Sequence, residues 1–381
     1  MSKRTNLSVD CQLKLANPAV FAVKNDYQIM VPVKSDLLFW VTVDGKNYYD
    51  HSNGIIRSST RMHRVNVPMC ALDKTGEYTV TYRKIIDRKP YFAETEEPVS
   101  ATYSFRPVPA SGDIYIYHLS DTHGKFDIPS QTATYFGDDL DLFILNGDVP
   151  DHSGNIENFD LIFKLCEAVT HGSRTCLFSR GNHDTRGFYA ENIADFTPTE
   201  NGHSYYTFRV GSVWGILMDC GEDKTDDHAE YGHTVCCHEF RLEETEYLKK
   251  IIADAKNEYL ADGIEHRLVI VHNPFSLTIP APFDIEQPLF SEWLKLLGDN
   301  VKPELFLSGH LHTTEISPIG GKLDSKGQIC PVVVGSKEVT DPETKKIVDF
   351  IGCAVTLSDK KAKVFFTNST HAAVEEHTVE L

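Results

Sequence analysis

The chain has 381 residues, of which 55 are acidic and 37 basic, so its formal net charge is −18. Hydrophobic residues account for 41% of it and charged residues for 24%, which is ordinary for a folded globular protein and excludes a disordered chain. The acidic balance argues against nucleic acid or an anionic membrane as the partner, and the length favours two domains.

The start of the chain predicts no targeting segment. Two cations stand within residues 1–6, but no apolar segment of signal-peptide length follows, and no later run approaches the length of a membrane span. The nine cysteines lack regular spacing, which favours reduced thiols over a disulfide framework. The adjacent Cys236 and Cys237 do not suit one tetrahedral zinc ion. We therefore expect a cytoplasmic protein that does not bind membranes.

Residues 1–106 are predicted to form a small all-β domain. Apolar and polar residues alternate with the period of a strand in five segments: 28–33, 37–43, 64–67, 77–83 and 101–105. Asp44 and Gly45 make a good two-residue hairpin turn after the second of them. The pattern predicts an immunoglobulin-like β-sandwich, and the proline-rich residues 107–112 predict a short, stiff linker behind it.

Residues 113–381 are predicted to form an α/β domain. Helical periodicity is present at 156–169 and 243–255. Additional strands are predicted at 205–209, 213–218, 350–357, 363–367 and 374–379. A core of two sheets with helices outside accounts for both kinds of segment.

Five polar motifs each follow an apolar run that is typical of a buried strand. The runs are 114–119, 142–145, 175–178, 268–271 and 305–307. The motifs behind them are Asp121-Thr122-His123, Gly147-Asp148, Gly181-Asn182-His183-Asp184, His272-Asn273 and Gly309-His310-Leu311-His312. Since open α/β folds place their sites at the carboxyl ends of neighbouring strands, we expect these side chains to gather there.

The residue types in the motifs suit a pair of divalent cations. Asp121 and His123 lie two apart, so at an extended strand end they share a face and can bind the same ion. Asp148, at the tip of the next strand, is the natural bridge between two ions. His310 and His312 have the same spacing, although in a tight loop each can serve a different ion. Imidazole and carboxylate together suit manganese, iron or zinc better than calcium, and the choice among the three stays open.

In this order, the motifs resemble those of the calcineurin-like metallophosphoesterase superfamily across nearly all of residues 113–370. The resemblance implies a two-sheet metallophosphoesterase sandwich that holds two divalent ions. The ligands that it implies are Asp121, His123, Asp148 and His312 for one ion, and Asp148, Asn182, His272 and His310 for the other. It further implies hydrolysis of small phosphate esters by a hydroxide held between the ions, with His183 as the general acid. Asp184 is expected to orient a neighbouring histidine by accepting its hydrogen bond.

The chain resembles purple acid phosphatases in two features. One is the predicted β-sandwich in front of the catalytic domain, and the other is the motif at residues 181–187. Those enzymes carry a second aspartate-type motif and a metal-bound tyrosine three residues after the bridging aspartate. This chain has His123 and Asp151 at the matching places. An iron–tyrosinate colour is therefore not expected.

Substrate contacts are predicted on two segments beside the motifs. Arg186 can pair a substrate phosphate through its planar fork, although a surface ion pair with an acid explains it equally well. Residues 219–239 form a long polar loop, and such loops often cover an active site. His228, Tyr231 and His233 are therefore candidates for substrate contact, with a plain solvated loop as the alternative.

Competing functions differ in what they need from this site. A nuclease is disfavoured by the acidic balance and the absence of basic runs. A scaffold that kept the fold but lost catalysis is the alternative to an enzyme, and an intact ligand set with His183 argues against it. The motifs do not distinguish hydrolysis of monoesters from hydrolysis of diesters, because both reactions use the same metals. The substrate, the oligomeric state and the role of residues 1–106 stay open.

Overall fold

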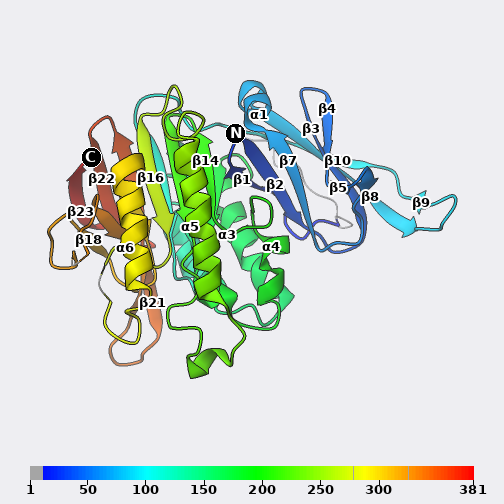
Figure 1. Cartoon of the computed structure of the whole chain (residues 1–381). Helices are drawn as coiled ribbons and strands as arrows, with labels where there is room; N and C mark the ends of the chain where they lie inside the picture. Colours follow the sequence, from blue (N-terminus) through cyan, green and yellow to red (C-terminus); the bar gives the residue numbers. More distant parts are fainter. Residues whose placement is uncertain (1–11, 278, 325) are drawn as a thin grey trace.

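The computed structural model describes residues 12–277, 279–324 and 326–381. The first residues of the predicted N-terminal domain, 1–11, lie outside the described residues. Strands form three main sheets, and the helices lie on the outer faces of two of them (Figure 1). In the described residues no helix is long and apolar enough to cross a membrane.

The largest sheet has ten strands and runs through both predicted domains. Its order is β23-β22-β21-β11-β12-β13-β1-β2-β7, and β20 pairs with β21 beside this path. The strands are β1 (Ala19–Val23), β2 (Asp26–Pro32), β7 (Met62–Pro68), β11 (Ile114–Leu119), β12 (Leu142–Asn146), β13 (Thr175–Ser179), β20 (Lys337–Thr340), β21 (Ile347–Ser358), β22 (Lys361–Thr367) and β23 (Ala373–Glu380). The central strands β11, β12 and β13 are parallel, so their carboxyl ends lie at one edge.

A second sheet of six strands packs against the first. Its order is β14-β15-β16-β17-β19-β18, and β15, β16 and β17 are parallel. The strands are β14 (Tyr206–Val210), β15 (Val213–Met218), β16 (His266–Val271), β17 (Leu305–Ser308), β18 (Glu315–Ser317) and β19 (Val332–Val334). Ile144 of the first sheet and Leu268 of the second are fully buried in one core between the two sheets.

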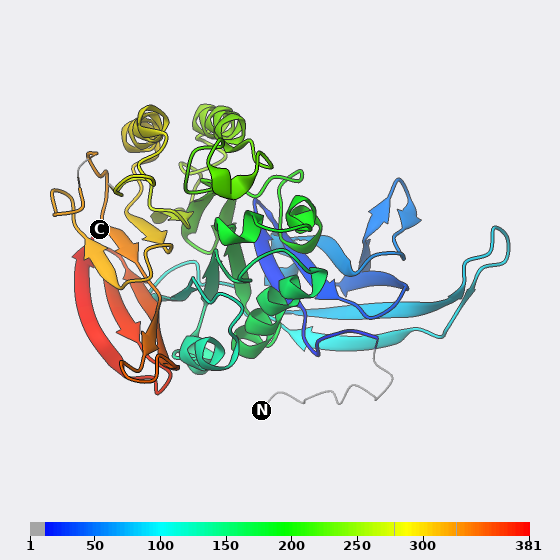
Figure 2. The same ribbon diagram turned by 90° about the horizontal axis from the view of Figure 1, so that it is seen from below.

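Helices cover the outer faces of both sheets, as expected for a two-sheet α/β sandwich (Figures 1 and 2). Phe163 of α3 (Asp160–Thr170) and Ala133 of α2 (Asp127–Ala133) pack on the large sheet. Leu248 of α5 (Cys237–Ala253) and Trp293 of α6 (Gln287–Leu296) pack on the other. The shorter turns are α4 (Ile193–Phe196), η1 (Gly137–Asp139), η2 (Ile156–Phe159), η3 (His183–Thr185), η4 (Ala190–Asn192), η5 (Ala229–Tyr231) and the π-turn η6 (Leu297–Val301).

The N-terminal region is an all-β sandwich, as predicted. A five-stranded sheet, β10-β8-β3-β4 with β9 on β8, packs against the β1-β2-β7 end of the large sheet. The elements are β3 (Leu37–Val43), β4 (Lys46–Tyr49), the hairpin of β5 (His51–Ser52) and β6 (Ile55–Ile56), α1 (Met69–Thr75), β8 (Glu77–Asp87), β9 (Glu94–Thr95) and β10 (Val99–Ser104). One layer of this sandwich is thus part of the ten-stranded sheet, because β1 pairs in parallel with β13. A division at residues 107–112 into separately folding domains stays a prediction.

Helix α5 begins at Cys237, six residues before the helix that the hydrophobic period predicts. The carboxylate of Asp226 accepts hydrogen bonds from the backbone N–H groups of Cys237, at 2.9 Å, and His238, at 3.0 Å. A cap supplied from eleven residues away satisfies the first turn, and such a cap leaves no local signal in the sequence. The polar loop after β15 is therefore shorter than 219–239.

Candidate metal centre

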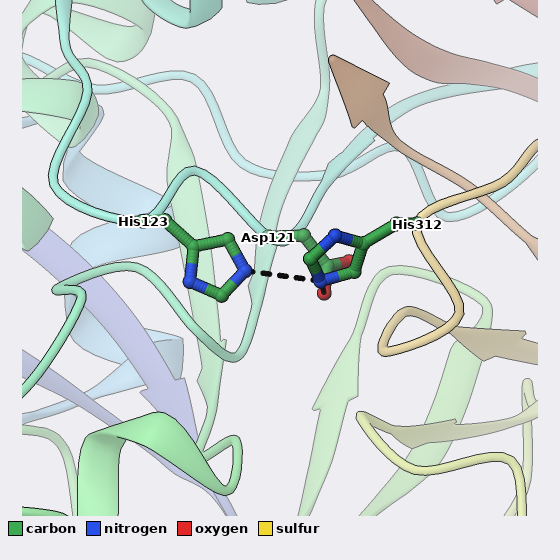
Figure 3. A group of neighbouring side chains, drawn as sticks. All are labelled: Asp121, His123 and His312. Atoms are coloured by element: carbon green, nitrogen blue, oxygen red, sulfur yellow. Dashed lines mark hydrogen bonds and ion pairs between the residues drawn. The ribbon is translucent and has the colours of Figure 1, made fainter.

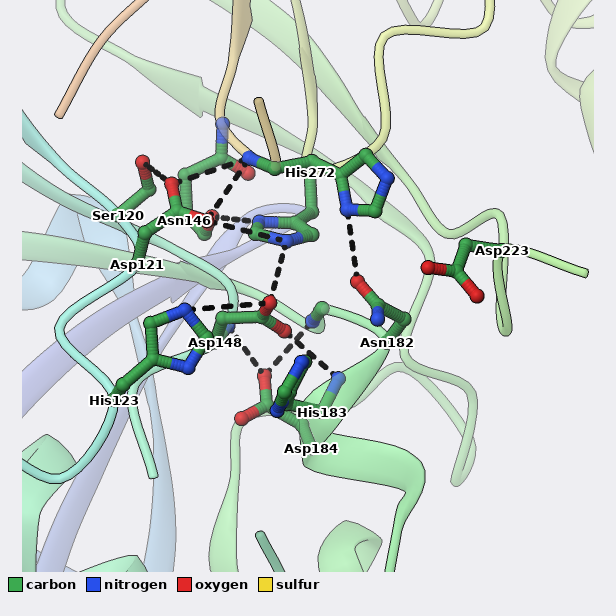
Figure 4. Close-up of polar contacts among 12 residues, drawn as sticks. Ser120, Asp121, His123, Asn146, Asp148, Asn182, His183, Asp184, Asp223 and His272 are labelled. Atoms are coloured by element: carbon green, nitrogen blue, oxygen red, sulfur yellow. Dashed lines mark hydrogen bonds and ion pairs between the residues drawn. The ribbon is translucent and has the colours of Figure 1, made fainter. Parts of the chain in front are cut away.

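The five polar motifs converge where the two sheets face each other. Asp121 follows β11, Asp148 follows β12 and Asn182 follows β13, all at one edge of the large sheet. His272 follows β16 and His310 follows β17 of the second sheet. Figure 4 shows Asp121, Asp148 and His272 pointing toward one another, with Asn182 beside them. The structure thus brings together groups that lie far apart in the sequence.

The loops that carry these groups have an unusual backbone. Asp121, His123, Asp148, His310 and His312 all have positive φ, between 44° and 69°. For residues other than glycine this costs roughly 1–2 kcal/mol each, and such strain gathers at functional sites. Hydrogen bonds between the loops help to hold it, since Asp121 N–H donates to Gly147 O at 3.1 Å and His123 N–H to Asp148 O at 3.0 Å.

Two glycines let the loops approach each other closely. A Cβ on Gly147, where φ is +77°, would lie 2.5 Å from Cγ of His272. A Cβ on Gly181 would lie 2.5 Å from the backbone nitrogen of Asp148. Because real Cβ atoms do not come this close to other groups, only glycine allows Asp148 and His272 their positions.

Asp121, His123 and His312 form the first potential metal-binding group, with their donor atoms within 4.8 Å of one another (Figure 3). The Nε2 atoms of His123 and His312 are 3.1 Å apart, and Nε2 of His312 is 3.5 Å from Oδ1 of Asp121. Donors that bind one ion at about 2.1 Å lie roughly 3.0–3.4 Å apart. The spacing therefore fits three ligands around one ion.

Asp148, His272 and His310 form the second group within the same limit. Nδ1 of His272 lies 2.6 Å from the carbonyl oxygen of Asn146, so Nδ1 donates a proton to that carbonyl and Nε2 is the nitrogen that can bind a cation. Nε2 lies 3.1 Å from Oδ2 of Asp148, but no partner among the described residues meets hydrogen-bond geometry. A buried imidazole nitrogen 3.1 Å from a carboxylate oxygen suits two ligands of one cation, which would take the place of a proton on Nε2. Asn182 Oδ1 lies 3.0 Å from Nδ1 of His310 and can join this group.

Asp148 lies between the two groups. Its Oδ2 is 3.1 Å from His272 Nε2 and 4.0 Å from His123 Nε2. Its Oδ1 accepts a hydrogen bond of 2.8 Å from the backbone N–H of His183. The carboxylate is buried and hydrogen-bonded on one oxygen, with the other facing both groups, which suits a bridge between two cations.

The electrostatics of the centre favour a positive charge. Burial acts to lower the pKa of His272, but the carboxylates of Asp148 and Asp121 raise it to about 10. Burial raises the pKa of Asp121, whereas His272 and the other facing histidines hold the pKa of Asp148 well below its usual value. Two buried carboxylates that force a proton onto an imidazole are a site that divalent metal ions fit.

His183 lies beside the centre, with its side chain half-buried. Its Nδ1 lies 3.0 Å from the carbonyl oxygen of Asp151, so this nitrogen donates, and Nε2 lies 3.4 Å from Nη1 of Arg186. Oδ1 of Asp151 lies 3.3 Å from Nδ1 of His123, which places a carboxylate behind a candidate ligand. In the sequence, Asp151 stands out only because it takes the place of a tyrosine. Its contacts with His183 and His123 depend on how the loop after β12 folds, which no sequence pattern predicts.

Asp184 differs from the expectation that it orients a histidine. Its Oδ2 accepts hydrogen bonds from the backbone N–H groups of Gly181, at 2.8 Å, and Asp148, at 3.2 Å (Figure 4). Burial and the nearby Asp148 raise its pKa to about 8. The side chain therefore ties the loop after β13 to the loop after β12, which positions Asp148 rather than an imidazole.

Two of the expected substrate contacts, Arg186 and Tyr231, bind acidic side chains of the protein. The fork of Arg186 binds the buried Glu222, with Nε 3.0 Å from Oε1 and Nη2 2.9 Å from Oε2. The hydroxyl of the buried Tyr231 donates to Asp223 at 2.8 Å. His233 is exposed beyond the turn η5. Arg186 therefore cannot bind a phosphate through Nε and Nη2 together, because the carboxylate of Glu222 already binds both. Glu222 lies on the loop after β15, and no sequence motif marks it.

Comparison with known proteins identifies the family. The family model for calcineurin-like phosphoesterases matches residues 114–314, more than half of the chain. The chain belongs to this family. Purple acid phosphatase PPD1 from yellow lupin (Lupinus luteus) seeds has a similar structure, with a TM-score of 0.61 at 14% identity over 95% of this chain and 74% of that one. PhoD gives a TM-score of 0.54 at 10% identity over 98% and 90%. No curated protein matches the chain.

These similarities confirm the resemblance to metallophosphoesterases with a sandwich in front. At such low identity, the two solved structures show a shared fold and nothing finer. The family and the clusters of histidine and aspartate support metal-dependent hydrolysis of phosphate esters in general.

Proposed function

We propose that this protein hydrolyses small phosphate esters at a centre of two divalent metal ions, with His183 as the proton donor. The observation that carries the proposal is the position of Asp148, whose Oδ2 faces one donor group at 3.1 Å and the other at 4.0 Å. One ion would be held by Asp121, His123, Asp148 and His312. The other would be held by Asp148, Asn182, His272 and His310. Imidazole and carboxylate favour manganese, iron or zinc.

The metal ions, when bound, lower the pKa of water and neutralise charge on the phosphoryl oxygens. The residues around them supply the rest. The backbone carbonyl of Asp151 fixes the ring of His183 through Nδ1, so Nε2, which lies beside Nη1 of Arg186, is the nitrogen that would pass a proton to the departing oxygen. The backbone N–H of His183 is held by Asp148, which sets the distance between the proton donor and the centre. His183 is thus fixed at both its backbone and its ring.

Hydrolysis of nitrophenyl phosphate and bis-nitrophenyl phosphate by the manganese-loaded protein tests the proposal, and the ratio of the two rates separates monoesterase from diesterase activity. His183→Ala is expected to lower kcat by about 10²–10⁴-fold, the usual contribution of a general acid. His377→Ala, a half-exposed histidine on the edge strand β23, is the control. Absence of activity with manganese, iron and zinc, or indifference to His183→Ala, would instead support a scaffold.

A further inference from the structure

Two basic side chains, Arg186 and Lys224, form with Glu222, Asp223 and Glu230 a charged cluster, here called the rim, and Arg186 lies next to the proposed proton donor. Nη1 of Arg186 is 3.4 Å from Nε2 of His183. Lys224 lies on the loop after β15 and is almost entirely buried. One carboxylate joins the two cations, because Oε1 of Glu230 is 3.2 Å from Arg186 Nη1 and Oε2 is 3.0 Å from Lys224 Nζ. The pair therefore already binds a carboxylate in this structure.

Buried acids hold the inner sides of both cations. Glu222, which is fully buried, binds Nε and Nη2 of Arg186 and accepts from the hydroxyl of Thr185 at 2.8 Å. Asp223 lies 2.8 Å from Lys224 Nζ and accepts from the hydroxyl of Tyr231. Glu222 thus pairs with Arg186, whereas Asp223 pairs with Lys224 and also lies 3.5 Å from Nη2 of Arg186. These contacts orient both side chains and leave Nη1 of Arg186 and part of the Lys224 ammonium to face Glu230.

Glu230 is the exposed member of this cluster. Its side chain is 41% exposed, compared with 0% for Glu222 and 8% for Asp223. It stands on the three-residue turn η5, directly before Gly232 and His233, which both have positive φ. Water screens the exposed carboxylate of Glu230 and reduces what its two ion pairs contribute to stability, so another anion can replace Glu230 at small cost. Without Glu230, the formal charges of the four remaining groups, Arg186, Lys224, Glu222 and Asp223, sum to zero.

We propose that Arg186 and Lys224 form a subsite for a second anionic group of the substrate, which Glu230 occupies as an internal stand-in. The inference rests on the proposed function, because it takes His183 as the donor to the leaving oxygen. Since Arg186 lies beside His183, the second anion belongs to the leaving group. The substrate class is a phosphate ester of a small alcohol that carries a carboxylate or a second phosphate a few bonds from the ester oxygen. Arginine and lysine bind both kinds of anion.

Matched substrates test the subsite in the full, manganese-loaded chain. The carboxylate of 3-phosphoglycerate replaces the hydroxymethyl group of glycerol 3-phosphate on the same three-carbon frame. We expect kcat/KM to be at least about tenfold higher for 3-phosphoglycerate, as for a charge-assisted contact. The pair of 1,3-propanediol bisphosphate and 3-hydroxypropyl phosphate shows whether a phosphate serves in place of the carboxylate. Equal values within both pairs would overturn the proposal.

Two variants separate the subsite from general effects. Lys224→Gln is expected to bring the ratio for the first pair close to one. Glu230→Gln is expected to raise the ratio severalfold, through a lower KM for 3-phosphoglycerate, because the internal competitor loses its charge. Glu191→Gln removes the same charge from an exposed residue of η4 and is the control. A ratio that Lys224→Gln leaves at the wild-type value would contradict the inference.

Binding of uncleavable phosphonates gives a second readout that needs no turnover. Calorimetry on the metal-loaded protein compares 4-phosphonobutyrate with butylphosphonate, which has a methyl group in place of the carboxylate. Tighter binding of 4-phosphonobutyrate that Lys224→Gln removes supports the subsite, even if no ester is hydrolysed and the proposed function fails. Equal binding of the two compounds, together with measured hydrolysis of nitrophenyl phosphate, would overturn the subsite and leave the proposed function standing.

Discussion

The metal centre and the rim beside it hold their charged groups in different ways. In the centre, the side chains stand at the ends of five strands, three of which are followed by turns with positive φ, and glycines let the loops approach closely. At the rim, long side chains of Arg186, Lys224 and Glu230 reach one another from an irregular loop and its neighbour. The backbone therefore fixes the first arrangement, while the balance of charges fixes the second.

The two arrangements suit two different roles, metal binding in the centre and choice of substrate at the rim. A rigid centre keeps donor atoms at spacings that a metal ion requires, whatever substrate arrives. At the rim, a substrate that carries a second anion would displace Glu230, whereas a substrate without one would not. Changes to the centre should therefore alter metal content and all activities together, whereas changes at the rim should alter the choice of substrate.

Loss of the proposed bridge should have the largest effect. Asp148→Asn keeps the shape of the side chain but removes the negative charge that faces both donor groups. Activity on nitrophenyl phosphate is expected to fall to background, and the metal content to fall from two ions toward one or none. Initial rates and elemental analysis measure the two quantities. A variant with full metal content and full activity would show that the ligand assignment is wrong.

Gly181→Ala tests the centre without removing any charge. The added Cβ would lie 2.5 Å from the backbone nitrogen of Asp148, so the two loops would have to move apart. We expect metal affinity to drop by about a hundredfold, as for changes that displace a ligand. Titration with manganese at fixed protein concentration measures the drop. Gly202→Ala is the matched control, because open space surrounds that glycine; its positive φ of +88° costs stability but leaves the metal affinity unchanged.

Glu222→Gln tests the innermost layer of the rim. The variant leaves the guanidinium of Arg186 beside a neutral amide instead of a fully buried carboxylate. Arg186 is partly exposed, which reduces the loss, so we expect the free energy of unfolding to fall by about 2 kcal/mol. Urea denaturation measures it. An unchanged stability would mean that the rim is held by the backbone, like the centre, and the comparison would fail.

Asp151 lies between the two regions, because it is 60% exposed yet contacts His123. Asp151→Asn removes the carboxylate from behind that candidate ligand but keeps the carbonyl that binds His183. We expect metal affinity to decrease by about tenfold, the small end of the range for such supporting groups. Activity measured at saturating manganese should recover. A loss that persists at saturating metal would instead assign the carboxylate to catalysis.

The same contrast explains what the sequence could predict. Each candidate ligand follows an apolar run that must enter the core, and parallel strands bring such ends to one edge, so convergence of Asp121, Asp148 and His272 could be predicted. The partners of Arg186 could not, since Glu222 and Glu230 belong to a loop whose folding no period describes. The sequence does contain a signal that the ten-stranded sheet extends into the N-terminal region. The run Ala-Val-Phe-Ala-Val of β1 is buried on both faces, which is typical of a strand inside a sheet.

The smallest expected effect concerns the outermost residue of the rim. Glu230→Gln removes a carboxylate that is 41% exposed from two ion pairs, and screening at this exposed partner keeps their contribution near the range of surface pairs, about 0–1 kcal/mol. Urea denaturation should therefore show a change in unfolding free energy below about 1 kcal/mol, smaller than that of Glu222→Gln. The change should shrink further at high salt, because screening weakens exposed pairs first. A loss as large as that of Glu222→Gln would mean that Glu230 is a structural member of the rim, and an anion could not replace it cheaply.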